Sequence, residues 1–261
     1  MTLFEELTED REEDKEIVKS FITKDSLSPD IFKGDGESFI MHDDVRKILL
    51  KVCDSFIDSL GVEFFVHDVI LTGSLSNYNW SRYSDLDLHI IVDMDEFGEE
   101  SKNEILIRQI FKEFFDTKKD SWNKKHNIKI KNYDVELYVQ DVNEKHVSTG
   151  IYSVLHNKWV IEPKKDKSNI EDDKIIEKGE EITKKINSLI KDKKDKDILE
   201  KIDCLRDRIK KFRKCGLDKG GEFSYENLVF KLLRRNGTIE RLLKFRTSLI
   251  DKKLSLKETP K

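Results

Sequence analysis

Residues 71–93 read LTGSLSNYNWSRYSDLDLHIIVD, and this stretch decides the fold. An apolar run ends at Gly73-Ser74, and eleven residues after Ser74 a second apolar run opens with Asp85 and Asp87. Side chains two residues apart on a strand point to the same face, so the two carboxylates are expected to lie together. A buried carboxylate is costly and two neighbouring ones repel each other, so either a positive group lies beside them or the stretch is not buried.

The composition of the chain limits the classes of protein to consider. The 261 residues carry 49 Lys and Arg against 53 Asp and Glu, a formal net charge of -4, so no overall basic character indicates nucleic-acid binding. Only 11 Gly and 3 Pro are present, which favours regular, helix-rich structure. Cys53, Cys204 and Cys215 are too far apart to predict a zinc site or a disulfide framework.

Targeting and membrane signals are missing from the pattern. The first residues are acidic and have no apolar core of the kind that a signal peptide needs. No run approaches the roughly 18 apolar residues that span a bilayer. We therefore expect a cytoplasmic protein without a membrane partner.

Hydrophobic periodicity predicts a mixed α/β part followed by an all-helical part. Expected helices cover 5–22, 44–60, 74–80 and 101–115, and expected strands cover 62–73, 85–93 and 127–140. The apolar faces of two helices are predicted to comprise Val45, Ile48, Leu49, Val52, Phe56 and Leu60 in one, and Ile105, Leu106, Ile110, Phe111 and Phe114 in the other.

After Pro163 the pattern indicates helices only, with a break at 216–222 and Ser224 as the N-cap of the next helix. The expected organisation is an acidic N-terminal arm or helix over 1–40, a core over 41–162 and a C-terminal helical domain over 163–261.

Gly73-Ser74 lies where the first strand ends and the short helix is expected to begin. Backbone N–H groups at a helix start are unpaired and carry the positive end of the helix dipole. This arrangement suits a phosphate, which a glycine lets approach closely. A tight turn with Ser74 as an N-cap explains the same two residues without a ligand, so Gly73-Ser74 alone is weak evidence of a phosphate-binding site.

The acids suggest a metal site. Asp85 and Asp87 would share one face while Leu86, Leu88 and Ile90 face the core. A divalent cation with oxygen ligands removes the repulsion between the acids, and Mg²⁺ is the usual choice beside phosphates. A solvent-facing strand edge with two unremarkable acids is the alternative. The later strand offers a third acid, Asp134 or Glu136, and its alternation excludes neither.

Together these features resemble the DNA polymerase beta-like nucleotidyltransferase superfamily. Its signature is a hydrophobic residue followed by Gly and Gly or Ser, a gap of about ten residues, and an acid-hydrophobic-acid motif, with another acid on a later strand. Residues 71–74 and 85–88 match it, and Glu136 is preferred over Asp134 because VELYVQD is similar to the third-acid strand of small, often phage-encoded members. The resemblance implies an α+β fold, with a nucleotidyltransferase-type core of a small mixed β-sheet and flanking helices, followed by an all-α helical domain.

The resemblance also implies an activity. The chain would move an NMP from an NTP, such as ATP, to an acceptor hydroxyl and release pyrophosphate, in the host cytoplasm if it is phage-encoded. Asp85, Asp87 and Glu136 would be catalytic and would bind two Mg²⁺ ions, or Mn²⁺. Residues 73–74 would bind the terminal phosphates, and Arg82 would contact phosphate or acceptor.

Several alternatives stay open. The acceptor is an RNA 3′ end, a protein hydroxyl, a small molecule or another nucleotide. A catalytically silent nucleotide- or RNA-binding module is the second hypothesis, and a helical interaction protein is the third.

His89 is interpreted either as a partner of Asp87 or as a core histidine. The basic residues of the last helices would bind phosphate or simply face solvent; they are Lys231, Arg234, Arg235, Arg241 and Lys244.

Overall fold

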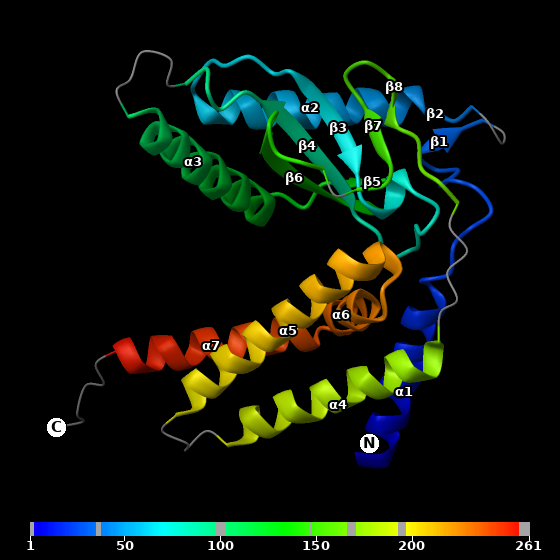
Figure 1. The fold of residues 1–261 in the computed structure, drawn as a ribbon, viewed down its shortest axis with the longest axis vertical. Helices are drawn as coiled ribbons and strands as arrows, with labels where there is room; N and C mark the ends of the chain where they lie inside the picture. Colours follow the sequence, from blue (N-terminus) through cyan, green and yellow to red (C-terminus); the bar gives the residue numbers. More distant parts are fainter. Residues whose placement is uncertain are drawn as a thin grey trace. The chain divides into compact units, whose positions relative to one another are not determined.

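The structure, a computed structural model, describes residues 3–34, 38–97, 103–146, 148–165, 171–192 and 197–255. It confirms the mixed α+β fold predicted from the sequence, with a six-stranded sheet, flanking helices and a helical C-terminal region (Figure 1). The chain forms two compact units. Thr23–Lys167 contains the sheet, and Met1–Ile22 with Ser168–Lys261 contains helices.

The six strands follow the order β5-β6-β4-β3-β7-β8 across the sheet. Their bounds are β3 Asp68–Thr72, β4 Leu86–Val92, β5 Lys129–Ile130, β6 Tyr133–Asp141, β7 Ile151–Ser153 and β8 Lys158–Ile161. Among the described residues of this sheet, β4 and β6 form the only parallel pair, and the other neighbouring strands pair antiparallel. A parallel pair needs a crossover connection, which here contains α3 (Glu104–Lys125). A separate two-stranded ladder joins β1 (Phe32–Lys33) to β2 (Ile40–Met41).

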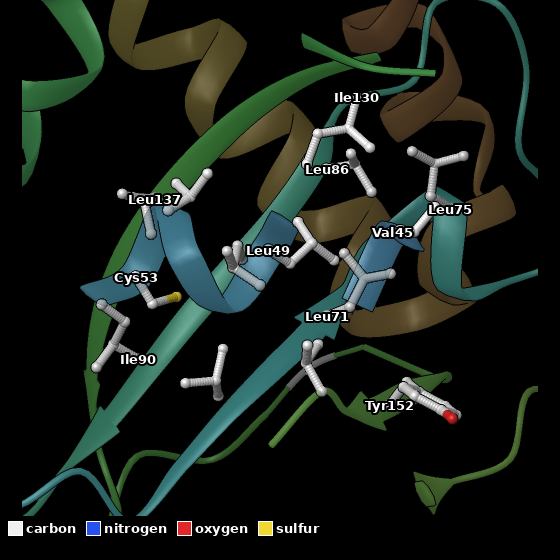
Figure 2. Close-up of a cluster of buried hydrophobic side chains, with 14 of the residues drawn as sticks. Val45, Leu49, Cys53, Leu71, Leu75, Leu86, Ile90, Ile130, Leu137 and Tyr152 are labelled. Carbon is white, nitrogen blue, oxygen red and sulfur yellow. The ribbon is translucent and has the colours of Figure 1, made fainter. Parts of the chain in front are cut away.

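One face of the sheet packs against α2 (Asp43–Leu60), the helix predicted over 44–60. Figure 2 shows this core, to which α2 contributes Val45, Leu49 and Cys53 and the strands contribute Leu71, Leu86, Ile90 and Leu137. Leu86, Leu88 and Ile90 are each 0% exposed, so the alternation predicted for β4 is confirmed. The opposite face of β4 therefore carries Asp87 and His89.

The prediction for the apolar face of α2 was wrong at one residue, Ile48. Ile48 is 42% exposed, whereas Cys53 is buried at 1% exposure. On a helix with 3.6 residues per turn, Cys53 lies nearer the middle of the stripe formed by Leu49, Phe56 and Leu60 than Ile48 does.

Helix α3 covers the edge of the sheet along β6. The side-chain amide of Asn123 donates to the carbonyl of Leu137 (2.9 Å), and its oxygen accepts from the N–H of Leu137 (3.1 Å). These two bonds satisfy backbone groups that the two-residue strand β5 leaves without a strand partner. Asn123 therefore anchors β6 at the residue that follows Glu136.

The predicted apolar side of α3 was partly wrong. Ile105, Leu106 and Ile110 are exposed, whereas Phe111 and Phe115 contact the ring of Phe97. The helix runs to Lys125 rather than ending at residue 115, and the predicted start at 101 lies outside the described residues. The apolar face of α3 that packs against the rest of the unit therefore begins at Phe111, later in the helix than the sequence pattern predicted.

Two predicted strands are shorter than expected. Residues 62–67 are not in a strand, and Phe65 is 64% exposed. The stretch 127–140 is a hairpin rather than one strand, because Lys131 and Asn132 have positive φ angles of 50° and 69°. Two consecutive residues in the left-handed region form the tight turn that joins antiparallel strands.

The helical unit contains five α-helices among its described residues. They are α1 Leu3–Lys19, α4 Asp172–Lys191, α5 Ile198–Gly220, α6 Tyr225–Arg235 and α7 Thr238–Leu254. Helix α1 contacts α4 and α6, so the stretch 1–40 is divided between the two units, with 23–40 in the sheet unit. None of the helices that the structure describes is both long and apolar enough to cross a bilayer.

The predicted break at 216–222 was mostly wrong, because α5 continues to Gly220. Gly216 is buried beside α6, and a Cβ there would lie 2.7 Å from Cβ of Glu226. This glycine therefore allows close helix packing rather than ending a helix. Ser224 occupies the N-cap position of α6, as predicted, but its side chain makes no capping hydrogen bond.

Candidate active site

Three neighbouring strands carry a row of polar side chains on the face opposite α2. Thr72 on β3 is aligned with Asp87 on β4, which is aligned with Glu136 on β6. Asp85 immediately precedes β4 and lies two residues from Asp87. Ligand oxygens of Asp85, Asp87 and Glu136 all lie within 4.8 Å of one another, and the three side chains are half-buried. The fold thus brings together the three acids singled out in the sequence.

The other acid considered from the sequence lies elsewhere. Asp134 is exposed and forms an ion pair with Lys129 on β5, with 2.8 Å between Nζ and Oδ1. Its position on the β5–β6 hairpin explains this, because the register aligns Asp134 with Lys129. The cluster of three described acids therefore contains Glu136 and not Asp134.

Gly73 adjoins the cluster. Its φ angle is 76°, in the left-handed region that favours glycine, and a Cβ there would lie 2.0 Å from Oδ2 of Asp87. A side chain at this position would overlap the carboxylate. The glycine therefore lets the strand-end backbone approach the acid.

The segment after Gly73 differs from the predicted helix over 74–80. It is a single 3₁₀ turn, η1 (Ser74–Ser76), and not an α-helix. A turn this short aligns too few peptide dipoles to attract an anion as a helix start does, so that part of the phosphate argument was wrong. A phosphate-binding role for residues 73–74 rests instead on hydroxyl and backbone donors.

Buried polar side chains hold this turn in place. The Ser74 and Ser84 hydroxyl oxygens are 2.7 Å apart, and Oγ of Ser84 also accepts from the N–H of Ser81 (3.0 Å). Ser76, which is 0% exposed, donates its hydroxyl to the carbonyls of Gly73 and Gly150. Ser84 belongs to the loop that the sequence places at the border of the cleft, whereas Ser76 was missed as a supporting residue, although the serine-rich stretch between residues 74 and 84 was a visible signal.

Arg82 is exposed and lies in a turn that precedes β4. Its guanidinium donates to the hydroxyl of Tyr83 (2.7 Å) and lies 4.8 Å from the centre of that ring. A nucleotide-binding role for Arg82 stays a prediction.

A second row of side chains lies next to the acids on the same face. His89 on β4 is aligned with Tyr138 on β6, and the two rings stack with centroids 4.8 Å apart at 20°. His89 Nε2 is 3.1 Å from Oγ1 of Thr72, and Nδ1 is 2.9 Å from Oε1 of Gln140. The hydroxyl of Tyr138 donates to Oε2 of Glu136 (2.6 Å).

Burial sets the protonation of this second row. It lowers the pKa of His89 to about 4, against the opposing effect of the hydrogen bond with Gln140. It also raises the pKa of Tyr138 well above its usual range, and the neighbouring Glu136 acts in the same direction. Near neutral pH, both rings are therefore uncharged.

The chemistry of the donor set fits a hard divalent cation. Three carboxylates offer only oxygen ligands, which Mg²⁺ and Mn²⁺ prefer, and Gly73 leaves the carboxylate of Asp87 uncovered by a Cβ. A second described group, His67, Asp93 and Glu96, also has ligand atoms within 4.8 Å of one another, at the other end of β4. Its mixed nitrogen and oxygen donors lie away from the Gly73 turn.

The chain shows little similarity to known proteins. No protein-family model matches the chain, and no curated protein does. Among solved structures, it is similar to a STING-associated CdnE c-di-GMP synthase from Capnocytophaga granulosa. The two chains are 13% identical over 82% of this chain and 84% of that chain, with a TM-score of 0.20. At this TM-score the folds superpose poorly, and the likeness supports no statement about this chain.

Proposed function

We propose that this chain is a metal-dependent nucleotidyltransferase of the DNA polymerase beta-like superfamily. It would transfer an NMP from an NTP to an acceptor hydroxyl and release pyrophosphate. The observation that carries the proposal is the cluster of Asp85, Asp87 and Glu136, which lie on or next to two parallel strands, with Asp87 directly beside Gly73. Acids alone are common on protein surfaces, so this combination with a glycine-lined strand end is what supports the activity.

Each group has a distinct role in this proposal. Asp85, Asp87 and Glu136 would hold the divalent cation, Mg²⁺ or Mn²⁺, through their clustered oxygens. When bound, such a cation neutralises phosphate charge and lowers the pKa of the attacking hydroxyl. The Ser74 hydroxyl, oriented by Ser84, would donate to a terminal phosphate oxygen.

The transfer balances without a redox partner. The acceptor hydroxyl gives up its proton to solvent as its oxygen forms a bond to the α-phosphorus. The bond from that phosphorus to the bridging oxygen breaks, and its electron pair leaves with pyrophosphate. The chain's contribution is to position the reactants and to compensate their charge, as is usual in phosphoryl transfer.

The test uses α-labelled NTPs, supplied one at a time with Mg²⁺ or Mn²⁺ and with total RNA, the protein itself or small hydroxyl compounds as acceptors. Asp87→Asn should lower transfer at least about 100-fold, because it weakens the binding of the cation. Asp134→Asn is the matched control, since it removes an exposed acid from the neighbouring strand. Undiminished transfer by Asp87→Asn would overturn the assignment.

A catalytically silent nucleotide-binding module makes a different prediction in the same experiment. It would bind a metal–NTP complex but would label none of the acceptors. Release of pyrophosphate that depends on Asp87 and on an acceptor would exclude that alternative.

A further inference from the structure

We propose that Tyr138 is a positioning residue that fixes the carboxylate of Glu136 for divalent-cation binding, and that His89 holds the Tyr138 ring. The inference rests on the proposed function, because it assigns a supporting role within the same site. Neither aromatic residue belongs to the three-acid motif.

The first observation is the bond between Tyr138 and Glu136. The two residues lie two positions apart on β6, so their side chains share one face. The Tyr138 hydroxyl donates to Oε2 of Glu136 at 2.6 Å, a short bond of the kind formed with an ionised acceptor. A glutamate side chain has several rotatable bonds, and this contact restricts the last of them.

The second observation is that the Tyr138 ring is itself held. It stacks on His89, and Nζ of Lys119 on α3 lies 5.1 Å from its centre. His89 in turn has a hydrogen-bond partner at each ring nitrogen, Thr72 on β3 and Gln140 on β6. The chain of contacts thus runs from β3 through β4 to β6 and ends at the Glu136 carboxylate.

These contacts have a physical consequence for ligand binding. A carboxylate that is already oriented loses less conformational freedom when it coordinates a cation. Outer partners of metal ligands typically contribute about 10- to 100-fold in metal affinity or activity. Removal of the Tyr138 hydroxyl should therefore weaken cation binding without removing a ligand.

The test measures Mn²⁺ affinity in the full chain from the electron paramagnetic resonance signal of the free ion. Tyr138→Phe should bind Mn²⁺ about 10-fold more weakly than wild type. Tyr152→Phe is the matched control, because the Tyr152 hydroxyl accepts from the N–H of Met41 and donates to Asn157, away from the acids. It should bind Mn²⁺ as wild type does, even where its thermal stability falls.

Two further readouts separate positioning from general damage. With labelled NTP, Tyr138→Phe should raise the metal concentration needed for half-maximal transfer, while turnover at saturating Mn²⁺ recovers towards wild type. His89→Asn removes the stacking ring but keeps the hydroxyl of Tyr138, so it should cause a smaller loss of affinity. This second variant keeps the test valid if Tyr138→Phe folds poorly.

The outcomes distinguish this inference from the proposed function. Equal Mn²⁺ affinities for wild type and folded Tyr138→Phe, with Glu136→Gln weakened, overturn the positioning role alone. Tight Mn²⁺ binding by a wild type that transfers no NMP overturns the proposed function alone. Failure of His89→Asn to alter affinity, together with a weakened Tyr138→Phe, overturns the role assigned to His89.

Discussion

Gly73 and Asp87 are in direct contact across the end of the β3–β4 pair: a Cβ on Gly73 would lie 2.0 Å from Oδ2 of Asp87. The acid and the strand-end backbone are thus so close that no side chain fits between them. This relationship links the two motifs, Gly-Ser and Asp-Leu-Asp, which sequence analysis could associate only through their spacing.

Gly73→Ala should impair both folding and chemistry. Gly73 has φ 76° and ψ -160°, a combination essentially restricted to glycine, which costs an alanine about 1–3 kcal/mol, and the new methyl group must displace the Asp87 carboxylate. Misplacement of a reacting group by about 1 Å can lower a rate about 100-fold, which labelled-NTP transfer would measure.

Gly61→Ala is the matched control for this substitution. Gly61 has a φ angle of 66°, but a Cβ there meets nothing within 4 Å. Its αL conformation costs an alanine about 1–2 kcal/mol, so Gly61→Ala should lose about that much stability in denaturant unfolding and keep full transfer activity. Equal activity losses in the two variants would show that strain rather than contact with Asp87 is responsible.

Asn123→Ala should destabilise the sheet unit by about 2 kcal/mol, because it leaves the N–H and C=O of Leu137 without their side-chain partners. Urea unfolding monitored by circular dichroism measures the change in the free energy of unfolding. Asn123→Asp is a useful comparison, since it keeps an acceptor but loses the donor. A loss as small as that of a surface substitution would contradict the anchoring role of α3.

Lys231→Met should raise the free energy of unfolding at neutral pH by about 1 kcal/mol. Burial lowers the pKa of Lys231, with Arg235, Arg234 and Arg213 acting in the same direction. The charged form is therefore disfavoured in the folded state, and methionine removes that cost. Lys244→Met, which removes an exposed lysine paired with Glu240, should change stability little.

The difference in stability between wild type and Lys231→Met should depend on pH. The pKa of Lys231 is lower in the folded state than its ordinary value of about 10.4. At pH values between these two, the unfolded chain holds more protons than the folded chain, so the free energy of unfolding increases with pH. Wild type should therefore gain stability relative to Lys231→Met with rising pH. An advantage of the variant that stays constant up to pH 10 would contradict the assignment.

The cysteines should react at different rates with a thiol reagent. Cys204 and Cys215 are exposed, whereas Cys53 is buried and its pKa is raised by burial. Ellman's reagent should modify two thiols in the native protein and the third only after unfolding. Rapid reaction of all three in the native protein would contradict the packing of α2.

Sequence reasoning located the acids because their pattern is local. The spacing of Asp85 and Asp87 places both on one strand face, and alternation along β4 puts the leucines between and after them in the core. The choice of Glu136 over Asp134 came from a resemblance, and only the register of β4 with β6 brings Glu136 to the other two acids.

Features that depend on tertiary packing or backbone conformation were missed. The positive φ angles of Lys131 and Asn132 have no strong sequence signal, so the β5–β6 hairpin was predicted as one strand. The exposure of Ile105 and Ile110 follows from what α3 packs against, which periodicity alone does not specify. The Tyr138–His89 pair is formed by neighbouring strands, and no motif predicts it.

The in-register pairing of β4 with β6 also has a consequence for folding. A slip of one residue would turn Glu136 towards the α2 side and put Leu137 opposite Asp87. Because a crossover joins these strands, their pairing requires closure of a long loop and is expected to form slowly. Divalent-cation binding by the three acids would therefore report on correct strand register, and a time-resolved signal from it would separate the native chain from compact misfolded ones.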